Sequence, residues 1–237
     1  MFGKILRQPL RLIPAGTHLP ILQGRLRGKR WIAGSSIHGC WLGSYELEKQ
    51  KLFEAEVKRG SVVFDVGANV GFYTMLASVL VGPSGKVFAF EPVPRNIQLL
   101  NEHLRLNRIT NAKIIEKAVS DTNGQACFDE SADTSMGHLD VSGRLNVGTV
   151  SIDTLVSEGK VLLPECVKID VEGGEFRVLT GAKSMLAEAH PRIFLATHGK
   201  EIHRQCCEFL RSLDYDLVPI DGQSLEETDE VFASPRR

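Results

Sequence analysis

The chain has 237 residues, of which 43% are hydrophobic and 24% are charged, and its formal net charge is −1. This composition suits a globular protein with a full hydrophobic core and argues against a disordered chain or a repeat array. No apolar run reaches the ~18 residues that a membrane span needs. The basic N-terminus also lacks the apolar stretch of a secretory signal, so we expect a cytoplasmic protein.

The cysteines lead to the same expectation about the compartment. They form an odd set without the C-x-x-C spacing of a metal site, and two of them are sequence neighbours. We interpret them as reduced thiols. The set is Cys40, Cys127, Cys166, Cys206 and Cys207.

Charge is unevenly distributed along the chain. Residues 1–45 contain seven Lys and Arg residues and no acid, and the first acidic residue is Glu46. We predict a basic N-terminal arm (residues 1–45) that packs on a core domain formed by residues 46–237. The arm could recruit an anionic substrate, a membrane surface or an acidic partner, or it could be a solvated lead-in of short strands. Nucleic acid is not expected, because the domain is not basic overall.

A helix is predicted over residues 46–58, followed by an apolar strand that begins at Val62 and enters a glycine loop. Gly67 and Gly71 have no Cβ, so the backbone can turn sharply there and approach a ligand closely. A helix follows from Phe72 to Leu80. This order is typical of a strand–loop–helix nucleotide site.

The loop differs from a dinucleotide site in its glycine spacing. It reads Asp-x-Gly-x-x-x-Gly from Asp65 to Gly71, whereas the nicotinamide fingerprint is G-x-G-x-x-G. Asp65 would repel a phosphate but suits the cationic methionine end of S-adenosyl-L-methionine. We therefore expect S-adenosyl-L-methionine as the cofactor; the alternative is a plain turn with an Asp cap.

The next two predicted strands also end in polar residues. The run 86–90 ends at Glu91, whose carboxylate can accept both ribose hydroxyl protons, or which is simply solvated. A helix follows over residues 94–107. A third strand is expected over 113–119, and the Ser120 and Asp121 that follow it are placed to flank the adenine.

The segment 129–148 is the least regular stretch inside the chain. Strands over 125–129 and 146–152 are predicted to pair around it. A connection of this length is either a binding loop near the acceptor or a surface loop.

A further apolar run at residues 167–169 leads into Asp170, Glu172 and Glu175, so a third strand presents carboxylates at the ligand edge. Glu175 could serve only to stabilise the first turn of its helix. The remaining predicted elements are helices over 174–189 and 200–213, a strand over 192–198, and an edge hairpin of strands 216–220 and 230–234.

Three phrases occur in order: FDVGANVGFYT at residues 64–74, FEPVPRN at 90–96 and KIDVEGGE at 168–175. Together they resemble the FkbM-type methyltransferases, over roughly residues 45 to 235. The resemblance implies an α/β class I methyltransferase fold, Rossmann-like and doubly wound, with a mostly parallel seven-stranded sheet and an antiparallel closing strand. It also implies S-adenosylmethionine as methyl donor and a hydroxyl acceptor on a natural product or sugar.

The resemblance also assigns residues. Asp65, Gly67, Asn69 and Gly71, with Ala68 between them, would hold the methionine part of the donor, and Glu91 would hold the ribose. The chain has Gly174 where the family often has Ala. It also ends the fifth strand in Thr197-His198, where the family often has a Glu.

His198 is the best candidate for the base that accepts the hydroxyl proton, since an imidazole accepts protons near neutral pH. Asp170 or Glu172 could orient it or act directly, and a purely structural histidine is the alternative. A divalent ion on these three residues is conceivable. Because their spacing matches no dedicated metal motif, no metal is predicted.

The sequence therefore predicts S-adenosylmethionine-dependent methyl transfer, in the form of O-methylation, to a hydroxyl of a sugar, lipid-linked glycan or other small natural product. Two alternatives stay open. One is a nicotinamide-dependent oxidoreductase, against which the glycine spacing argues. The other is a non-catalytic relative that keeps the donor pocket.

Overall fold

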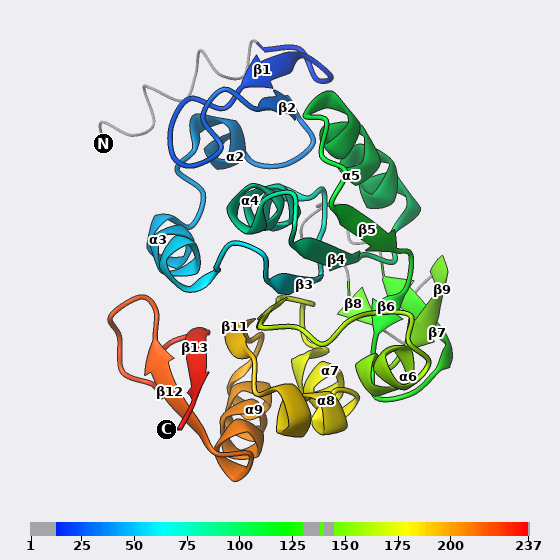
Figure 1. Cartoon of the computed structure of the whole chain (residues 1–237), viewed down its shortest axis with the longest axis vertical. Coiled ribbons are helices and arrows are strands. Elements are labelled where there is room, and N and C mark those ends of the chain that lie inside the picture. Colours follow the sequence, from blue (N-terminus) through cyan, green and yellow to red (C-terminus); the bar gives the residue numbers. More distant parts are fainter. Residues whose placement is uncertain (1–12, 130–137, 140–144, 237) are drawn as a thin grey trace.

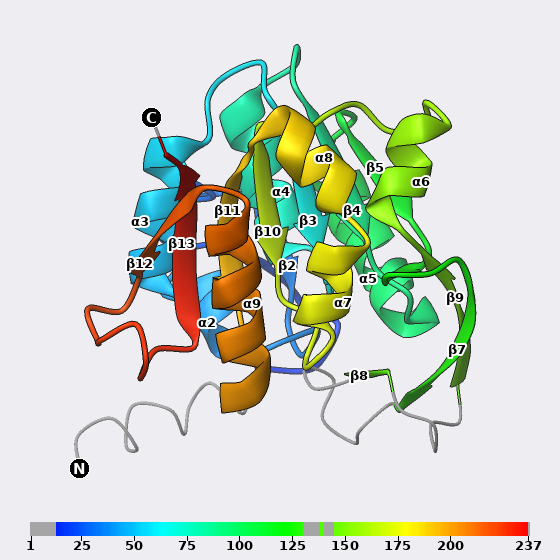
Figure 2. The ribbon, with the colours of Figure 1, turned by 90° about the horizontal axis from the view of Figure 1, so that it is seen from below.

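A central β-sheet covered by helices on both faces forms the core of the molecule (Figure 1). The computed structural model describes residues 13–129, 138–139 and 145–236. Helices α3, α4 and α5 cover one face of the sheet, and α7, α8 and α9 cover the other (Figures 1 and 2). Their bounds are α3 Leu47–Glu56, α4 Phe72–Val81, α5 Pro94–Leu106, α7 Glu175–Thr180, α8 Lys183–Ala189 and α9 Lys200–Ser212.

The sheet has seven strands in the spatial order β12-β13-β11-β10-β3-β4-β5. Strand β13 is antiparallel to β11 and β12, and the other neighbouring pairs are parallel. The predicted closing strand is therefore confirmed. The bounds are β3 Val62–Val66, β4 Lys86–Phe90, β5 Ala112–Ile115, β10 Cys166–Ile169, β11 Arg192–Ala196, β12 Tyr215–Pro219 and β13 Glu230–Pro235.

The strands read as apolar runs because both of their faces are buried. All five residues of β3 are buried, and so are all four of β10. Parallel sheets are covered on both sides, so their strands show no polar alternation. Phe64 packs its ring edge-on against Phe88 and Phe90 of the neighbouring strand.

The predicted strand over residues 113–119 is wrong as a single element. It divides into β5, which belongs to the main sheet, and β6 (Ala118–Val119), which pairs with β9 (Leu145–Val150) in a second sheet. Between them the Lys117 N–H donates to the Ile115 carbonyl, a tight bend that ends the first ladder. Apolar character alone did not show that the chain changes sheets here.

The predicted helix over residues 174–189 is also divided, into α7 and α8. The Asp153 carboxylate accepts hydrogen bonds from the N–H groups of Ser184 and Met185 and so caps α8 from a distant part of the chain. At the break, a Cβ on Gly181 would lie 2.1 Å from the Ser120 carbonyl oxygen. Close packing and a remote cap therefore interrupt a sequence that is helical by pattern.

The second sheet has the order β6-β9-β7-β8. Strand β7 (Gly124–Asp129) pairs antiparallel with β9, which confirms the predicted pairing, although the second strand ends at Val150 and not at the predicted residue 152. Strand β8 (His138–Leu139) pairs with β7, and α6 (Ile152–Ser157) follows β9. The predicted binding loop lies largely outside the described residues.

Residues 13–45 form β1 (His18–Pro20), β2 (Arg30–Ile32) and the short helix α2 (His38–Leu42). Strands β1 and β2 pair antiparallel. This segment lies above α4 and beside α5 (Figure 1). The side chain of Asn107 accepts from the Arg30 N–H at 2.7 Å and donates to the Arg30 carbonyl at 2.8 Å, which fixes β2 to the end of α5.

His103 of α5 makes a second attachment to β2. Its Nε2 accepts from the Ile32 N–H at 3.0 Å, and its Nδ1 donates to the Val70 carbonyl at 2.7 Å. Buried Trp31 stacks on the imidazole, with 4.0 Å between ring centroids. Because Val70 belongs to the glycine loop, His103 joins the N-terminal segment to that loop.

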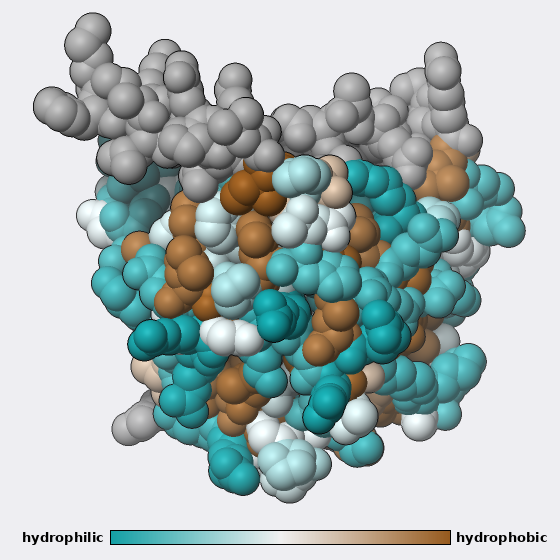
Figure 3. Space-filling view, turned by 90° about the horizontal axis from the view of Figure 1, so that it is seen from above, coloured by the Kyte–Doolittle hydropathy of each residue, from teal (hydrophilic) through white to brown (hydrophobic). Residues whose placement is uncertain are grey.

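The face of the molecule on which this segment lies mixes hydrophilic residues with smaller hydrophobic areas (Figure 3). Arg25, Arg27 and Arg30 are exposed around the turn between β1 and β2. The other predicted arm residues, 1–12, lie outside the described part of the chain. Among the described helices, none has the length and apolar character needed to cross a membrane.

Candidate active site

The loop after β3 turns sharply at two glycines. Gly67 has a φ of +77°, and a Cβ there would lie 1.8 Å from the Asp170 carbonyl oxygen. Gly71 has a φ of +97°, and its Cβ would lie 2.2 Å from Leu100 Cδ1. Glycine is therefore required by the turn and by neighbouring chain segments. The sequence had suggested close approach to a ligand as the reason.

Glu91 lies directly after β4 and is held by three donors. Its Oε2 accepts from the Asn69 N–H at 2.7 Å, and its Oε1 accepts from the Val93 N–H at 3.0 Å and the Asn96 amide at 3.2 Å. Burial raises the pKa of Glu91, and these hydrogen bonds oppose the shift. The loop of residues 67–71 and the predicted ribose ligand are thus joined directly.

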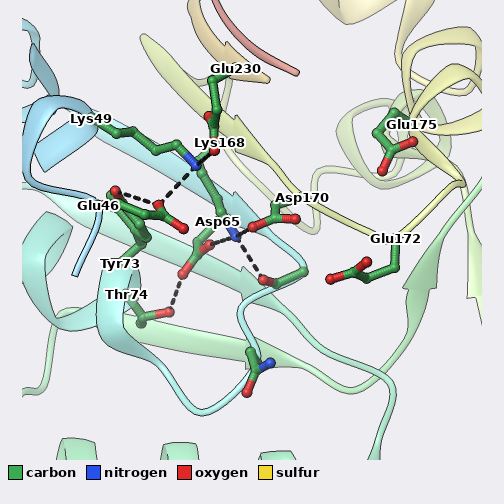
Figure 4. A network of polar contacts seen from close by, with 12 residues as sticks. Glu46, Lys49, Asp65, Tyr73, Thr74, Lys168, Asp170, Glu172, Glu175 and Glu230 are labelled. Atoms are coloured by element: carbon green, nitrogen blue, oxygen red, sulfur yellow. Dashed lines mark hydrogen bonds and ion pairs between the residues drawn. The ribbon is translucent and has the colours of Figure 1, made fainter. Parts of the chain in front are cut away.

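Asp65 lies behind the cavity wall rather than on it. Its side chain is 1% exposed, and Oδ2 accepts from the Thr74 hydroxyl at 2.6 Å. Its Oδ1 lies 3.5 Å from Lys168 Nζ (Figure 4). Asp65 is therefore not placed to make the predicted contact with the methionine part of a donor. Its charge acts through Lys168.

Lys168 of β10 is a buried cation at the centre of the site, and the sequence reasoning gave it no role. Its Nζ donates to the Gly67 carbonyl at 2.8 Å and lies 3.6 Å from Asp170 Oδ2. Burial favours the neutral amine, but the Asp170 and Asp65 carboxylates outweigh it and raise the pKa of Lys168. A lysine within an otherwise apolar buried strand was the signal that could have identified it.

A second buried lysine, Lys49 of α3, joins the cluster from the other side (Figure 4). Its Nζ lies 2.8 Å from Glu46 Oε2 and 2.5 Å from Glu230 Oε1. The Tyr73 hydroxyl donates to Glu46 at 2.9 Å. Burial raises the pKa of Glu230 to about 7, although Lys49 opposes the shift. Residues far apart in the chain thus form one polar network around two buried lysines.

A cavity of about 640 Å³ lies beside this network, a size typical of small-molecule sites. Its wall follows the carboxyl ends of the parallel strands, where ligands bind in doubly wound sheets. The predicted residues that line it are Gly67, Ala68, Asn69, Gly71, Glu91, Asp170, Glu172 and His198.

Two predicted adenine contacts, Ser120 and Asp121, do not line the cavity. Ser120 is buried, and its hydroxyl donates to Asp121 Oδ1 at 2.9 Å. The bend between β5 and β6 brings residues 117–119 to the wall instead. This is a consequence of the change of sheet that the sequence did not reveal.

His198 follows β11 and contacts three carboxylates. Its Nδ1 donates to Glu175 Oε1 at 2.8 Å, and its Nε2 lies 3.2 Å from Glu172 Oε2 and 3.9 Å from Asp170 Oδ1. The hydrogen bond to Glu175 is the largest effect on its pKa and raises it to about 9, against the effect of burial. The orienting residue is thus Glu175, whereas the sequence favoured Asp170 or Glu172.

Glu175 has no exposed surface, although it is the first residue of α7. Its Oε1 also accepts from the Gly173 N–H at 2.9 Å. A first-turn acid is common in helices, so sequence alone could not separate this role from helix stabilisation.

Asp170, Glu172 and His198 each offer one ligand atom within 4.8 Å of the others. These are donor types that a divalent cation accepts. A metal would have to compete with the proton that the surrounding carboxylates favour on His198.

The charge of the cavity suits a cationic ligand. Its wall includes the carboxylates of Glu46, Glu91, Asp170, Glu172, Asp229 and Glu230. A sulfonium and an ammonium group would be attracted to this wall, and a pyrophosphate would be repelled by it. The residues present therefore fit S-adenosylmethionine better than a dinucleotide.

The strand order, the antiparallel strand β13 and a cavity at the carboxyl ends of the strands define a class I methyltransferase fold. The family described as "Methyltransferase FkbM domain" matches residues 65–217. The chain belongs to this family.

Two curated relatives and a solved structure are similar to the chain. The hexuronic acid methyltransferase AglP of Haloferax volcanii is 34% identical over 144 residues, covering 60% of this chain and 58% of AglP. The 31-O-demethyl-FK506 methyltransferase FkbM of Streptomyces tacrolimicus is 29% identical, covering 57% of this chain and 67% of that protein. The match thus spans less than two thirds of AglP.

The crystal structure of methyltransferase FkbM from Methylobacillus flagellatus superimposes with a TM-score of 0.55 at 17% identity. It covers 73% of this chain and 43% of that one. At this identity the likeness concerns the fold.

Proposed function

We propose that the protein transfers the methyl group of S-adenosylmethionine to a hydroxyl oxygen of a small molecule, sugar or glycan. The observation that carries the proposal is the position of Glu91. A carboxylate at the tip of β4, hydrogen-bonded to the glycine loop, opens onto an acidic cavity at the ligand edge of the sheet. The names of the two relatives, which refer to hexuronic acid and FK506, support a hydroxylated acceptor.

Donor binding is assigned to the β3 and β4 side of the cavity. Glu91 would accept hydrogen bonds from the ribose hydroxyls, and residues 67–71 would enclose the methionine part. Lys168 keeps Asp170 and the Gly67 carbonyl in place, so the acidic wall stays fixed. Residues 117–119 are the proposed adenine contacts, in place of Ser120 and Asp121.

The donor supplies an electrophilic methyl group on a positively charged sulfur. The acceptor hydroxyl must be held in line with it and must lose its proton. His198 Nε2 is the proposed proton acceptor. Glu175 holds the proton on Nδ1, which leaves the Nε2 lone pair available once His198 is neutral, and Glu172 lies 3.2 Å from the same nitrogen.

Calorimetry with S-adenosylmethionine and with NADH tests the donor assignment. We expect S-adenosylmethionine to bind, Glu91→Gln to weaken its binding about tenfold, and NADH not to bind. Binding of NADH alone would instead indicate an oxidoreductase.

A labelled-methyl assay against cell fractions then tests transfer. Labelled product is expected with the wild-type protein and not with His198→Asn. Donor binding without any transfer would favour the non-catalytic alternative.

A further inference from the structure

The order of the strands gives the cavity two ends. The loop after β3 and Glu91 after β4 form the end to which the proposed function assigns the donor. The other end is built by residues that follow β10 and β11, by the start of β13, and by the segment before α3. Ala196 pairs with Glu230, which places the start of β13 beside the end of β11.

We call this second region the acceptor end, because the proposed function assigns the donor to the first. It consists of Glu46, Asp170, Glu172, His198, Asp229 and Glu230, all of which line the cavity.

Five of these six residues are acids, and the described cations in direct contact with them are already paired. His198 contacts Glu172 and Glu175. Lys168 lies between Asp65 and Asp170. In the described part of the wall, the other basic residues are Arg95 and Lys117, which follow β4 and β5 at the donor end.

Lys49, behind the wall, is paired in the same way with Glu46 and Glu230. Among the described residues of this end, an anionic group on an acceptor would therefore meet carboxylates without an unpaired cation to balance it. Like charges brought together in a partly buried site strongly disfavour a ligand. The raised pKa of Glu230, which is due mainly to burial with Glu46 and Asp170 adding to it, agrees with a site that already resists negative charge.

We propose that the part of the acceptor that enters this end is an uncharged ring with several hydroxyl groups, a neutral sugar, and that uronic acids and sugar phosphates are excluded. The proposal rests on the proposed function, which places the donor at the other end. Ionised carboxylates only accept hydrogen bonds, so they suit the hydroxyl groups of a sugar. Tyr45 and Ile37 also line the cavity and offer apolar surface to the carbon face of a ring.

The proposal separates this chain from its relative AglP, which is named for a hexuronic acid.

Matched pairs of sugars test it. Affinities of the methyl glycosides of glucose, galactose and mannose, and of the corresponding uronic acids, are measured by ligand-observed NMR with the protein loaded with S-adenosylhomocysteine. We expect at least one neutral sugar to bind at millimolar concentration and to bind at least about tenfold more tightly than its uronic acid. Equal or tighter binding of the uronic acid, or no binding of any neutral sugar, overturns the proposal.

A charge reversal provides the matched variant. Asp229→Lys should increase the affinity for the uronic acids about tenfold. Glu188→Lys, an exposed position on α8, makes the same change of net charge and should leave both affinities unchanged. An equal response of the two variants would refute the assignment of the effect to the cavity wall.

Methyl transfer is measured separately, with labelled donor and the same sugars. Absence of transfer with the neutral preference intact counts against the proposed function alone. Transfer to the uronic acids in preference to the neutral sugars counts against the acceptor proposal alone.

Discussion

At the scale of single residues, the chemistry of the site depends on how neighbours change ordinary side chains. His198 is the clearest case, because three carboxylates surround one half-buried imidazole. A base works only in its deprotonated form. With the pKa raised to about 9, most of His198 is protonated at neutral pH.

We therefore predict that kcat/KM rises with pH through a value near 9. Glu175→Gln removes the largest cause of the shift, so the same limb should move down toward the ordinary histidine value of about 6.5. The pH profile of labelled-methyl transfer measures both. His198→Asn should abolish the limb, and a limb that persists in this variant would exclude His198 as the base.

Metal removal gives a second prediction about the same residues. Treatment with EDTA should leave transfer unchanged, because the proposed mechanism uses the neutral imidazole of His198 as the base and needs no cation there. Activity that is lost with EDTA and restored by Mg²⁺ or Mn²⁺ would place an ion on Asp170, Glu172 and His198.

A third prediction concerns Gly67. Gly67→Ala should lower the free energy of unfolding by about 2–4 kcal/mol, since it adds a Cβ at a positive φ against the Asp170 carbonyl. The control is Gly174→Ala in the loop before α7, where φ is −97° and the nearest atom would lie at 3.4 Å. Chemical denaturation measures both, and equal losses would mean that the clash is relieved at little cost.

At the scale of elements, α5 is the part that connects the N-terminal segment to the donor loop. His103 bridges Ile32 of β2 and Val70 of the loop, and burial lowers its pKa to about 4. A shift in the position of β2 can therefore be transmitted through the His103 side chain to the loop on the donor side of the cavity.

We predict that His103→Ala lowers the free energy of unfolding by about 2–4 kcal/mol, because it leaves two buried backbone groups unpaired and removes the stack on Trp31. It should also weaken S-adenosylmethionine binding. His18→Ala, at an exposed position nearby, is the control. A destabilised variant with unchanged donor binding would show that the segment and the loop are not coupled.

The same residue predicts a pH dependence of stability. The folded pKa of about 4 lies below the unfolded value of about 6.5, so the unfolded chain binds more protons between these values. Stability should therefore fall as pH decreases from about 6.5 to 4, by at most about 3 kcal/mol. In His103→Gln this part of the pH dependence should be absent.

At the scale of the whole molecule, the N-terminal segment is basic and the remainder of the chain is acidic. The exposed arginines surround the β1–β2 turn, and none of them lines the described cavity. The proposed role of these arginines is therefore to attract an anionic surface or substrate to the outside of the protein. They do not contact a ligand inside the cavity.

We predict that the protein sediments with anionic vesicles at low salt and that high salt releases it. Arg25→Gln with Arg27→Gln should reduce binding while leaving donor affinity unchanged. The control pair, Lys183→Gln with Arg211→Gln, changes charge equally on α8 and α9, on the opposite face (Figure 1). Equal losses in the two pairs would mean that only net charge matters.

The strand ends and glycine positions allowed much of the fold and half of the site to be anticipated. Apolar runs at β3, β4 and β10 are long enough to specify buried parallel strands, and Glu91 and Asp170 follow two of them directly. Local pattern fails where a remote group decides. Asp153 caps α8, so the predicted helix over residues 174–189 is divided into α7 and α8. Pairing of β6 with β9 divides the predicted strand over residues 113–119.

The sequence by itself determined the order of the elements, the turn at Gly67 and Gly71, and the acidic character of the ligand edge, because these depend on neighbouring residues along the chain. Only the tertiary structure decided that Lys168 stands between Asp65 and the cavity, and that Glu175 rather than Asp170 holds His198. These pairings join strands and helices far apart in sequence. Their energies depend on burial and on distances of a few ångströms, which no local pattern encodes.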